Sequence, residues 1–140
     1  MLRALAKWWA RITYIWQLEF EAGKSDVNAA VAKRNADQVR NAVEQLNAEA
    51  DAIEANVKKV EAEEDARKKT DAYQKLSAQE KYEDERASKK EKDGALQMIA
   101  EKRGLAAQQS KEVSEKEQVA QSLRGLASNS REFADKIRQL

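Results

Sequence analysis

The first twenty residues concentrate the side chains best suited to binding another surface. They contain three tryptophans, a tyrosine and a phenylalanine, whereas the rest of the chain contains two tyrosines and one phenylalanine. At helical spacing, one face of this segment carries bulky apolar side chains and the opposite face carries cations. The apolar face consists of Leu2, Leu5, Trp9, Ile12, Trp16 and Phe20, with Trp8 and Ile15 at its border. The cations are Arg3, Lys7 and Arg11.

This arrangement is typical of a helix that lies at a membrane interface. Indole rings sit at the level of the lipid headgroups, and cations meet anionic lipid. Arg11 and Glu19 close a short apolar run, whereas a transmembrane helix needs roughly 20 apolar residues. The pattern therefore predicts that residues 1–22 bind an anionic lipid membrane by lying in its interface.

Two other uses of the aromatic segment are open at this stage. The helix could dock in the groove of a partner protein, which would make the chain a structural coiled-coil subunit or adaptor of a larger assembly. Deeper insertion would instead make it a pore-forming protein. The charges of Arg11 and Glu19 disfavour deep insertion.

The side chains that carry most enzyme chemistry are missing. The chain has no histidine and no cysteine, and its four glycines are isolated rather than grouped in a phosphate-binding loop. Carboxylates such as Glu63 and Glu64 have Lys or Arg close by, whereas a catalytic pair needs a concave, partly buried setting. We therefore expect no enzymatic activity, no cofactor, no metal and no small-molecule substrate. The net charge of +1 also disfavours nucleic acid as a partner.

The elements that must position these groups are expected to be helices. Charged residues make up 36% of the chain and proline is absent, while alanine, glutamate and lysine all favour helix. We predict an all-α fold that starts with an amphipathic helix over residues 2–22. Gly23 is expected to act as its C-cap or as a hinge, and Ser25 or Asp26 to cap the next helix.

A first long arm is predicted over residues 25–90. Small and apolar side chains repeat there with alternating steps of four and three residues, which is the heptad seam of a coiled coil. After this seam the sequence turns to dense mixed charge, with few apolar residues. The seam consists of Ala32, Ala36, Val39, Val43, Leu46, Ala50, Ile53, Val57 and Val60.

A second arm is predicted over residues 95–140, after a turn at residues 89–94 to which Gly94 gives backbone freedom. Two adjacent columns run along this arm at seven-residue spacing. One column is Ile99, Ala106, Val113, Ala120, Ala127 and Ala134. The other is Met98, Leu105, Val119, Leu126, Phe133 and Leu140, with Glu112 as its one polar member.

The expected architecture is a short amphipathic helix, residues 1–22, followed by a long antiparallel coiled-coil hairpin, residues 23–140, extended rather than globular. A seam made largely of alanine buries little surface, so we expect the hairpin to gain stability by self-association. The residues assigned to hairpin or oligomer packing are Val39, Val43, Leu46, Ile53, Val57, Val60, Leu105, Val113, Val119, Leu126 and Phe133.

These features together resemble the phage-shock protein A family, bacterial relatives of the eukaryotic ESCRT-III membrane-remodelling proteins. Residues 2–20 are similar to the family's N-terminal membrane-inserting helix, and residues 25–90 and 95–140 to its long hairpin. Several residues just after the predicted tip are similar in spacing to the start of the family's second arm. They are Asp93, Ala95, Glu101, Lys102 and Leu105.

The resemblance implies a non-enzymatic scaffold at the inner, cytoplasmic face of a membrane. Subunits of this family stack their hairpins into rods, rings or tubes, so the resemblance implies a homo-oligomer or polymer. The tryptophan-rich helices would then line one surface of the polymer and insert shallowly into anionic membrane, where they would stabilise or bend the bilayer. ESCRT-III-like proteins also open their hairpins into extended helices, so both states are expected.

Overall fold

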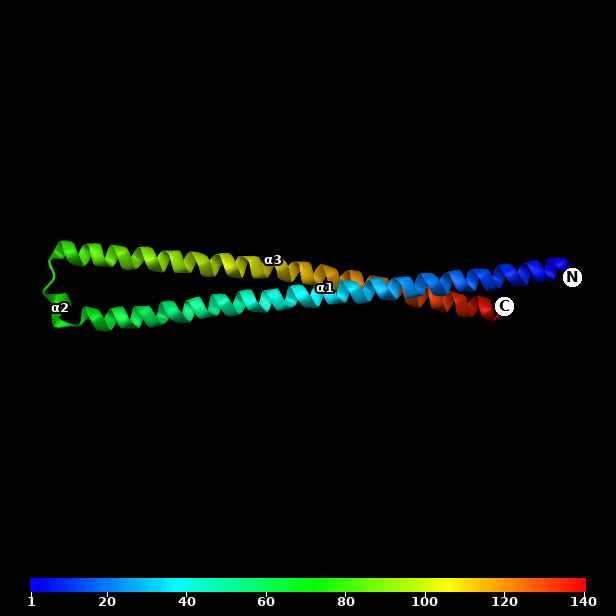
Figure 1. Cartoon of the computed structure of the whole chain (residues 1–140), viewed down its shortest axis with the longest axis horizontal. Coiled ribbons are helices and arrows are strands. Elements are labelled where there is room, and N and C mark those ends of the chain that lie inside the picture. Colours follow the sequence, from blue (N-terminus) through cyan, green and yellow to red (C-terminus); the bar gives the residue numbers. More distant parts are fainter. The chain divides into compact units, whose positions relative to one another are not determined.

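The computed structural model describes residues 1–140 and contains only helices, as the sequence predicted. They are α1 (Leu2–Lys68), α2 (Asp71–Gln74) and α3 (Ala78–Arg138), coloured along the chain in Figure 1. The chain divides into two compact units, each built from a segment of α1 and a segment of α3. Unit 1 comprises residues 1–40 and 111–140, and unit 2 comprises residues 41–110. None of the helices has an apolar stretch that is long enough to cross a bilayer.

Helix α1 continues through Gly23, where we expected a break. Gly23 is helical and has no positive φ, so it is neither a C-cap nor a hinge, and Ser25 and Asp26 lie inside the helix. A glycine inside a helix costs about 1 kcal/mol relative to alanine. No proline or capping arrangement adds to that cost here, so the helix-forming residues on both sides prevail.

In unit 1 the two helices meet through small side chains. The buried residues recur every seven positions on each helix, and most of them are alanines, which allow two helix axes to approach closely. On α3 this is the first of the two predicted columns. On α1 the column begins at Ile15, well before the predicted start at Ala32. The buried residues of unit 1 are Ile15, Ala22, Ala29, Ala36, Val113, Ala120, Ala127 and Ala134.

The two edges of the unit 1 seam differ in chemistry. On one edge, Glu19 pairs with Arg138, and further pairs join Asp26 to Arg131 and Arg40 to Glu117. On the other edge, the ring of Tyr14 meets that of Phe133 edge-on, with centroids 6.2 Å apart and planes at 82°. Tyr14 and Glu19 are five residues apart, about 140° around the helix, which places them on opposite sides of the buried column.

In unit 2 the same two helices run antiparallel but are joined mainly by charges. Ion pairs early in the α1 part of this unit join residues late in its α3 part, and pairs late in α1 join residues early in α3. Only a few side chains of this unit's helix pair are buried: Ala50, Ile99 and Ala106. The ion pairs are Glu49–Lys102, Glu54–Arg103, Glu61–Lys92, Arg67–Asp84 and Lys68–Glu85.

The chain reverses at residues 69–77, not at residues 89–94, which are helical. Thr70 caps α2 by accepting a hydrogen bond from the Tyr73 N–H, at 3.4 Å. Ser77 caps α3, since its Oγ accepts from the Glu80 N–H at 3.2 Å. The Tyr73 ring is buried, with the Arg67 guanidinium 5.4 Å and the Lys81 ammonium 5.7 Å from its centre.

The position of the turn follows from capping rather than from glycine. Ser77 and Glu80 have the spacing of a capping box, which satisfies orphan N–H groups at a helix start. Gly94 has no such partner, and the charged residues before it are good helix formers. The predicted first arm, residues 25–90, is therefore divided between α1, the turn and the beginning of α3.

Replacing the α3 cap tests this turn. Ser77→Ala should lower the free energy of unfolding by about 1 kcal/mol, because the Glu80 N–H loses its acceptor. Gly94→Ala should raise it by up to about 1 kcal/mol, because the site is helical and has open space for a methyl group. Urea unfolding followed by circular dichroism measures both. A loss of stability in Gly94→Ala would contradict this placement of the turn.

Candidate functional site

The N-terminal turns of α1 have no neighbour within the chain. Every residue from Met1 to Arg11 is exposed. Within unit 1, α1 extends past the C-terminal end of α3, as the blue and red ends in Figure 1 show. The contact between Tyr14 and Phe133 lies just inside that end. The first three turns of α1 are therefore open to a partner on all sides.

The aromatic side chains of this region face solvent. Trp8, Trp9 and Trp16 each expose more than half of their surface, and Phe20 exposes 71%. The rings of Trp8 and Trp9 are 6.5 Å apart and tilted by 43°, so they form one local cluster. Leu2 and Leu5 are also exposed. An exposed apolar surface of this kind marks a site for a protein or a membrane.

Two of the residues expected on the lipid-binding face are wholly or partly covered. Ile15 is only 7% exposed and belongs to the buried column of unit 1, so its expected place at the border of the lipid-binding face is wrong. Ile12 is half-buried. The reason is that α3 already packs against α1 at this level, which turns the Ile15 side of the helix into an interior.

The cations near the aromatic cluster lack partners. Arg3, Lys7 and Arg11 are exposed, and none of them takes part in an ion pair. The first carboxylate along α1, Glu19, is paired with Arg138. The exposed end of α1 therefore combines apolar rings with uncompensated positive charge.

The second apolar column of α3 also faces solvent. Leu105 in unit 2, and Val119, Leu126 and Phe133 in unit 1, each expose about half of their surface, whereas Val113 from the first column is buried. On α1, Val39, Val43, Leu46, Ile53 and Val57 are half-buried, and Val60 is 39% exposed. Of the residues assigned to packing, those on α1 line the helix pair, and most of those on α3 form a separate outer surface.

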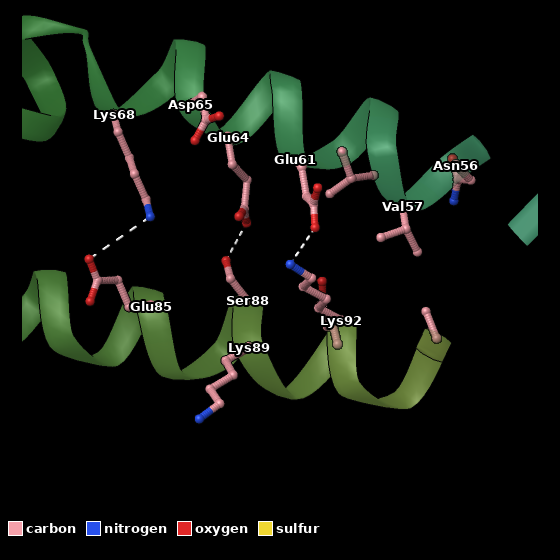
Figure 2. Close-up of a pocket in the computed structure, with 13 residues that line it drawn as sticks. Asn56, Val57, Glu61, Glu64, Asp65, Lys68, Glu85, Ser88, Lys89 and Lys92 are labelled. Atoms are coloured by element: carbon pink, nitrogen blue, oxygen red, sulfur yellow. Dashed lines mark hydrogen bonds and ion pairs between the residues drawn. The ribbon is translucent and has the colours of Figure 1, made fainter. Parts of the chain in front are cut away.

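A groove of about 530 Å³ lies between the two helices of unit 2 (Figure 2). It opens where the apolar seam ends at Val57 and Val60, and charged side chains from both helices line it. Glu61 pairs with Lys92, and the Ser88 hydroxyl donates to the Glu64 carboxylate. Other lining residues include Asn56, Asp65, Lys68, Glu85, Lys89, Glu91 and Ala95.

The paired acidic and basic side chains of unit 2 stabilise one another's ionised forms. A hydrogen bond from Lys102, with its positive charge, lowers the pKa of Glu49, and Arg103 does the same for Glu54. The Glu61 carboxylate raises the pKa of Lys92. A general acid or base at neutral pH needs shifts in the opposite directions. These groups therefore act as electrostatic links between the helices.

The structure also exposes apolar residues that we did not assign to the lipid-binding face. Val27 and Val31 are exposed on α1 beyond residue 22, where the predicted membrane helix ends. The predicted break at Gly23 places them outside the aromatic segment, whereas α1 is continuous there. Comparison with the models of known protein families, with curated protein sequences and with solved structures gave no match for this chain.

The pKa shifts of unit 2 predict how its stability depends on pH. Glu49 and Glu54 have folded-state pKa values below their ordinary 4.5. Their stabilising contribution is therefore present above pH 4.5 and is lost as pH falls through the lower folded values. The pKa of Lys92 lies above its ordinary 10.5, so its contribution is present below pH 10.5 and is lost as pH rises further.

Thermal unfolding followed by circular dichroism should show that the melting temperature decreases as the pH is lowered below 4.5. The variant Glu54→Gln should lose less stability on acidification than the parent chain, since it has one fewer carboxylate to protonate. Gln79→Glu serves as a control that adds an exposed carboxylate without removing an ion pair. An equal acid dependence in the parent chain and in Glu54→Gln would contradict the assignment.

Proposed function

We propose that this chain is a non-enzymatic scaffold that binds anionic membrane through the tryptophan-rich start of α1 and self-assembles through its helices. In this role it stabilises or bends the bilayer. The observation that carries the proposal is the exposure of Trp8 and Trp9 on turns of α1 that α3 leaves uncovered, and of Trp16 on a side of α1 that α3 does not cover. Beside them, Arg3 and Lys7 have no carboxylate partner, which suits anionic lipid.

The physical case for lipid rests on the combination of side chains. Tryptophan rings are apolar in body and carry an N–H donor, so they gain most where hydrocarbon meets headgroups. The interruption of the apolar run by Arg11 suits a helix that lies in the interface. One such helix binds weakly, and a polymer that presents many of them gains affinity through effective concentration.

We further propose that α1 and α3 form an antiparallel coiled-coil hairpin. The seven-residue spacing of the buried alanines in unit 1 supports this, since it is the repeat of a coiled-coil seam. The resemblance to the phage-shock protein A family points the same way, because hairpins of this kind are the building blocks of its assemblies. The turn at residues 69–77 would be the tip of the hairpin.

The exposed surface of the chain supports self-assembly. It amounts to 10798 Å² for a mass of 15.8 kDa. A compact folded monomer of that mass exposes about 7,300 Å², so this chain exposes about 3,500 Å² more. A standard interface covers about 800 Å² on each partner. Neighbouring copies that pack on the outer column of α3, around Val119, Leu126 and Phe133, would cover part of this surface.

Replacing one tryptophan tests lipid binding. Trp16→Glu should reduce co-sedimentation with vesicles of phosphatidylglycerol and phosphatidylcholine at least tenfold, because a carboxylate replaces an apolar ring at an anionic surface. Circular dichroism should show unchanged helix content. Gln17→Glu is the matched control, since it adds the same charge at the next residue, and it should bind more strongly than Trp16→Glu.

Equal binding by the parent chain and Trp16→Glu would contradict the proposal. Absence of binding by the parent chain would also contradict it, and the tryptophan surface would then be a docking site for a protein, as in an adaptor. Dye leakage from the same vesicles would reveal pore formation, which a peripheral scaffold should not cause.

A second variant tests self-assembly. Leu126→Glu should shift the chain towards smaller species in sedimentation velocity, because the change places a charge in the middle of the outer α3 column. Its helix content should stay the same, since Leu126 is exposed and lies outside the buried seam. Ser128→Glu adds the same charge at an exposed position nearby and should leave the distribution unchanged. Equal distributions for Leu126→Glu and the parent chain would exclude this surface.

A further inference from the structure

The outer side of α1 in unit 1 carries a stripe without a single charged residue. Its positions alternate by four and three residues, so they follow one line along the helix. Phe20 lies about 140° and Trp16 about 100° around the helix from Ile15, which places the stripe on a different side of α1 from the buried column. Arg34 ends the stripe. Its members are Leu2, Ala6, Trp9, Thr13, Trp16, Phe20, Gly23, Val27 and Ala30.

The stripe is exposed and continuous across Gly23. Phe20 exposes 71% and Val27 exposes 62% of their surfaces. The helix does not bend away between them, because Gly23 is helical with no positive φ. Nothing lies within 4 Å of a Cβ built on Gly23. Exposed apolar surface therefore continues well past the tryptophans, into the part of α1 that packs against α3.

The one hydroxyl in the stripe already has a hydrogen-bond partner. Thr13 donates from Oγ1 to the Trp9 carbonyl oxygen at 2.8 Å within the same helix. An unpaired hydroxyl is costly to bury in an apolar environment, whereas a paired one costs much less. The stripe can therefore enter an apolar environment along its whole length without leaving this donor unpaired.

The two flanks of the stripe differ in whether their charged side chains form ion pairs with α3. On one flank, the carboxylates of Glu19 and Asp26 are neutralised by Arg138 and Arg131 of α3. On the other flank, Arg3 and Lys24 make no ion pair. Residues 1–34 contain six Lys or Arg side chains and three carboxylates in all. This balance is complementary to an anionic surface.

We infer that the stripe from Leu2 to Ala30 is one continuous contact surface for anionic lipid, about 42 Å long at the helical rise. The inference rests on the proposed function and extends it. Membrane contact then includes the segment of α1 that packs on α3. Since the stripe and the buried column lie on different sides of α1, α3 packs on a side of α1 other than the one that meets the lipid.

An antiparallel second copy of the chain fits the same stripe less well. An antiparallel copy that binds stripe to stripe would bring the flank with Arg3 and Lys24 against the same flank of its partner. Like charges placed opposite each other across an interface oppose binding. An anionic membrane instead offers a flat apolar layer beneath a negative layer, which matches both the apolar stripe and its cationic flank.

Single labelled cysteines test the extent of the contact, and the absence of native cysteine makes each label specific. Phe20→Cys, Val27→Cys and Asn28→Cys each carry an environment-sensitive fluorophore, and vesicles contain phosphatidylglycerol and phosphatidylcholine in equal amounts. We expect the emission to shift to the blue and brighten at positions 20 and 27. Position 28 lies one residue off the stripe and should change little.

The outcomes separate this inference from the proposed function. A response at position 20, with positions 27 and 28 alike and unresponsive, would overturn the longer stripe and leave the tryptophan-rich anchor intact. No response at positions 20 and 27, together with no co-sedimentation, would overturn the proposed function itself. A response at position 28 as strong as at position 27 would show that the helix does not lie on this side.

A gain of binding provides an independent test. Gly23→Leu places an apolar side chain on the stripe in open space, and it should raise vesicle affinity several-fold. Gly125→Leu is the matched control, because Gly125 is helical, exposed and equally open but lies on the outer side of α3. Both changes raise helix propensity alike. Equal effects of the two changes on affinity would overturn the proposed orientation of α1 and α3.

Discussion

The seam of small side chains between α1 and α3 is the constraint on which the rest of unit 1 depends. With alanine at Ala22, Ala29 and Ala36 facing Ala120, Ala127 and Ala134 along the seam, the interior has no room for a large side chain. No large side chain in the chain is completely buried. Most bulky apolar residues of unit 1 are therefore outside, and Ile15 near the end of the seam is the exception. An alanine seam buries little apolar surface between α1 and α3. It leaves the tryptophans, Phe20 and the outer column of α3 exposed and available for other partners.

The two units use different forces to hold the same pair of helices. Unit 1 joins them by close packing, with an aromatic pair on one edge and ion pairs on the other. Unit 2 relies on charge, and its groove is bridged by pairs such as Glu61 with Lys92. Exposed ion pairs contribute little individually and weaken with added salt. Cohesion between the helices is therefore expected to be greater in unit 1 than in unit 2, and to respond less to the ionic environment.

Much of this architecture can be read from the sequence, because it depends on periodicity. The column from Ile99 to Ala134 was predicted and is buried, since seven-residue spacing fixes one line on a helix whatever packs against it. The turn predicted at Gly94 is wrong because α3 already begins after Ser77, whose Oγ accepts a hydrogen bond from the Glu80 N–H. The side chains around these residues, and not the glycine itself, decide where the helix ends.

The exposed apolar face of residues 2–20 could be predicted only in part for a related reason. In a helical-wheel projection of residues 2–20, the apolar side chains form one broad face. The sequence alone does not say which part of that face α3 covers. Ile15 shares the chemistry of Ile12 and Trp16, yet the packing of α3 makes it interior. The assumed break at Gly23 also hid the continuation to Val27. Both errors come from treating residues 2–22 as a helix separate from the rest of α1.

Because α1 is continuous through Gly23, its exposed aromatic stripe and its buried column keep a fixed angle around one helix axis. Each added or deleted residue rotates everything beyond it by about 100°, so a change of one or two residues between Trp16 and Ala36 would turn the tryptophans towards α3 or sideways. A change of seven residues would restore the alignment almost fully. Insertions or deletions in this part of the chain should therefore be tolerated only in multiples of seven residues, which preserve the helical phase of both surfaces.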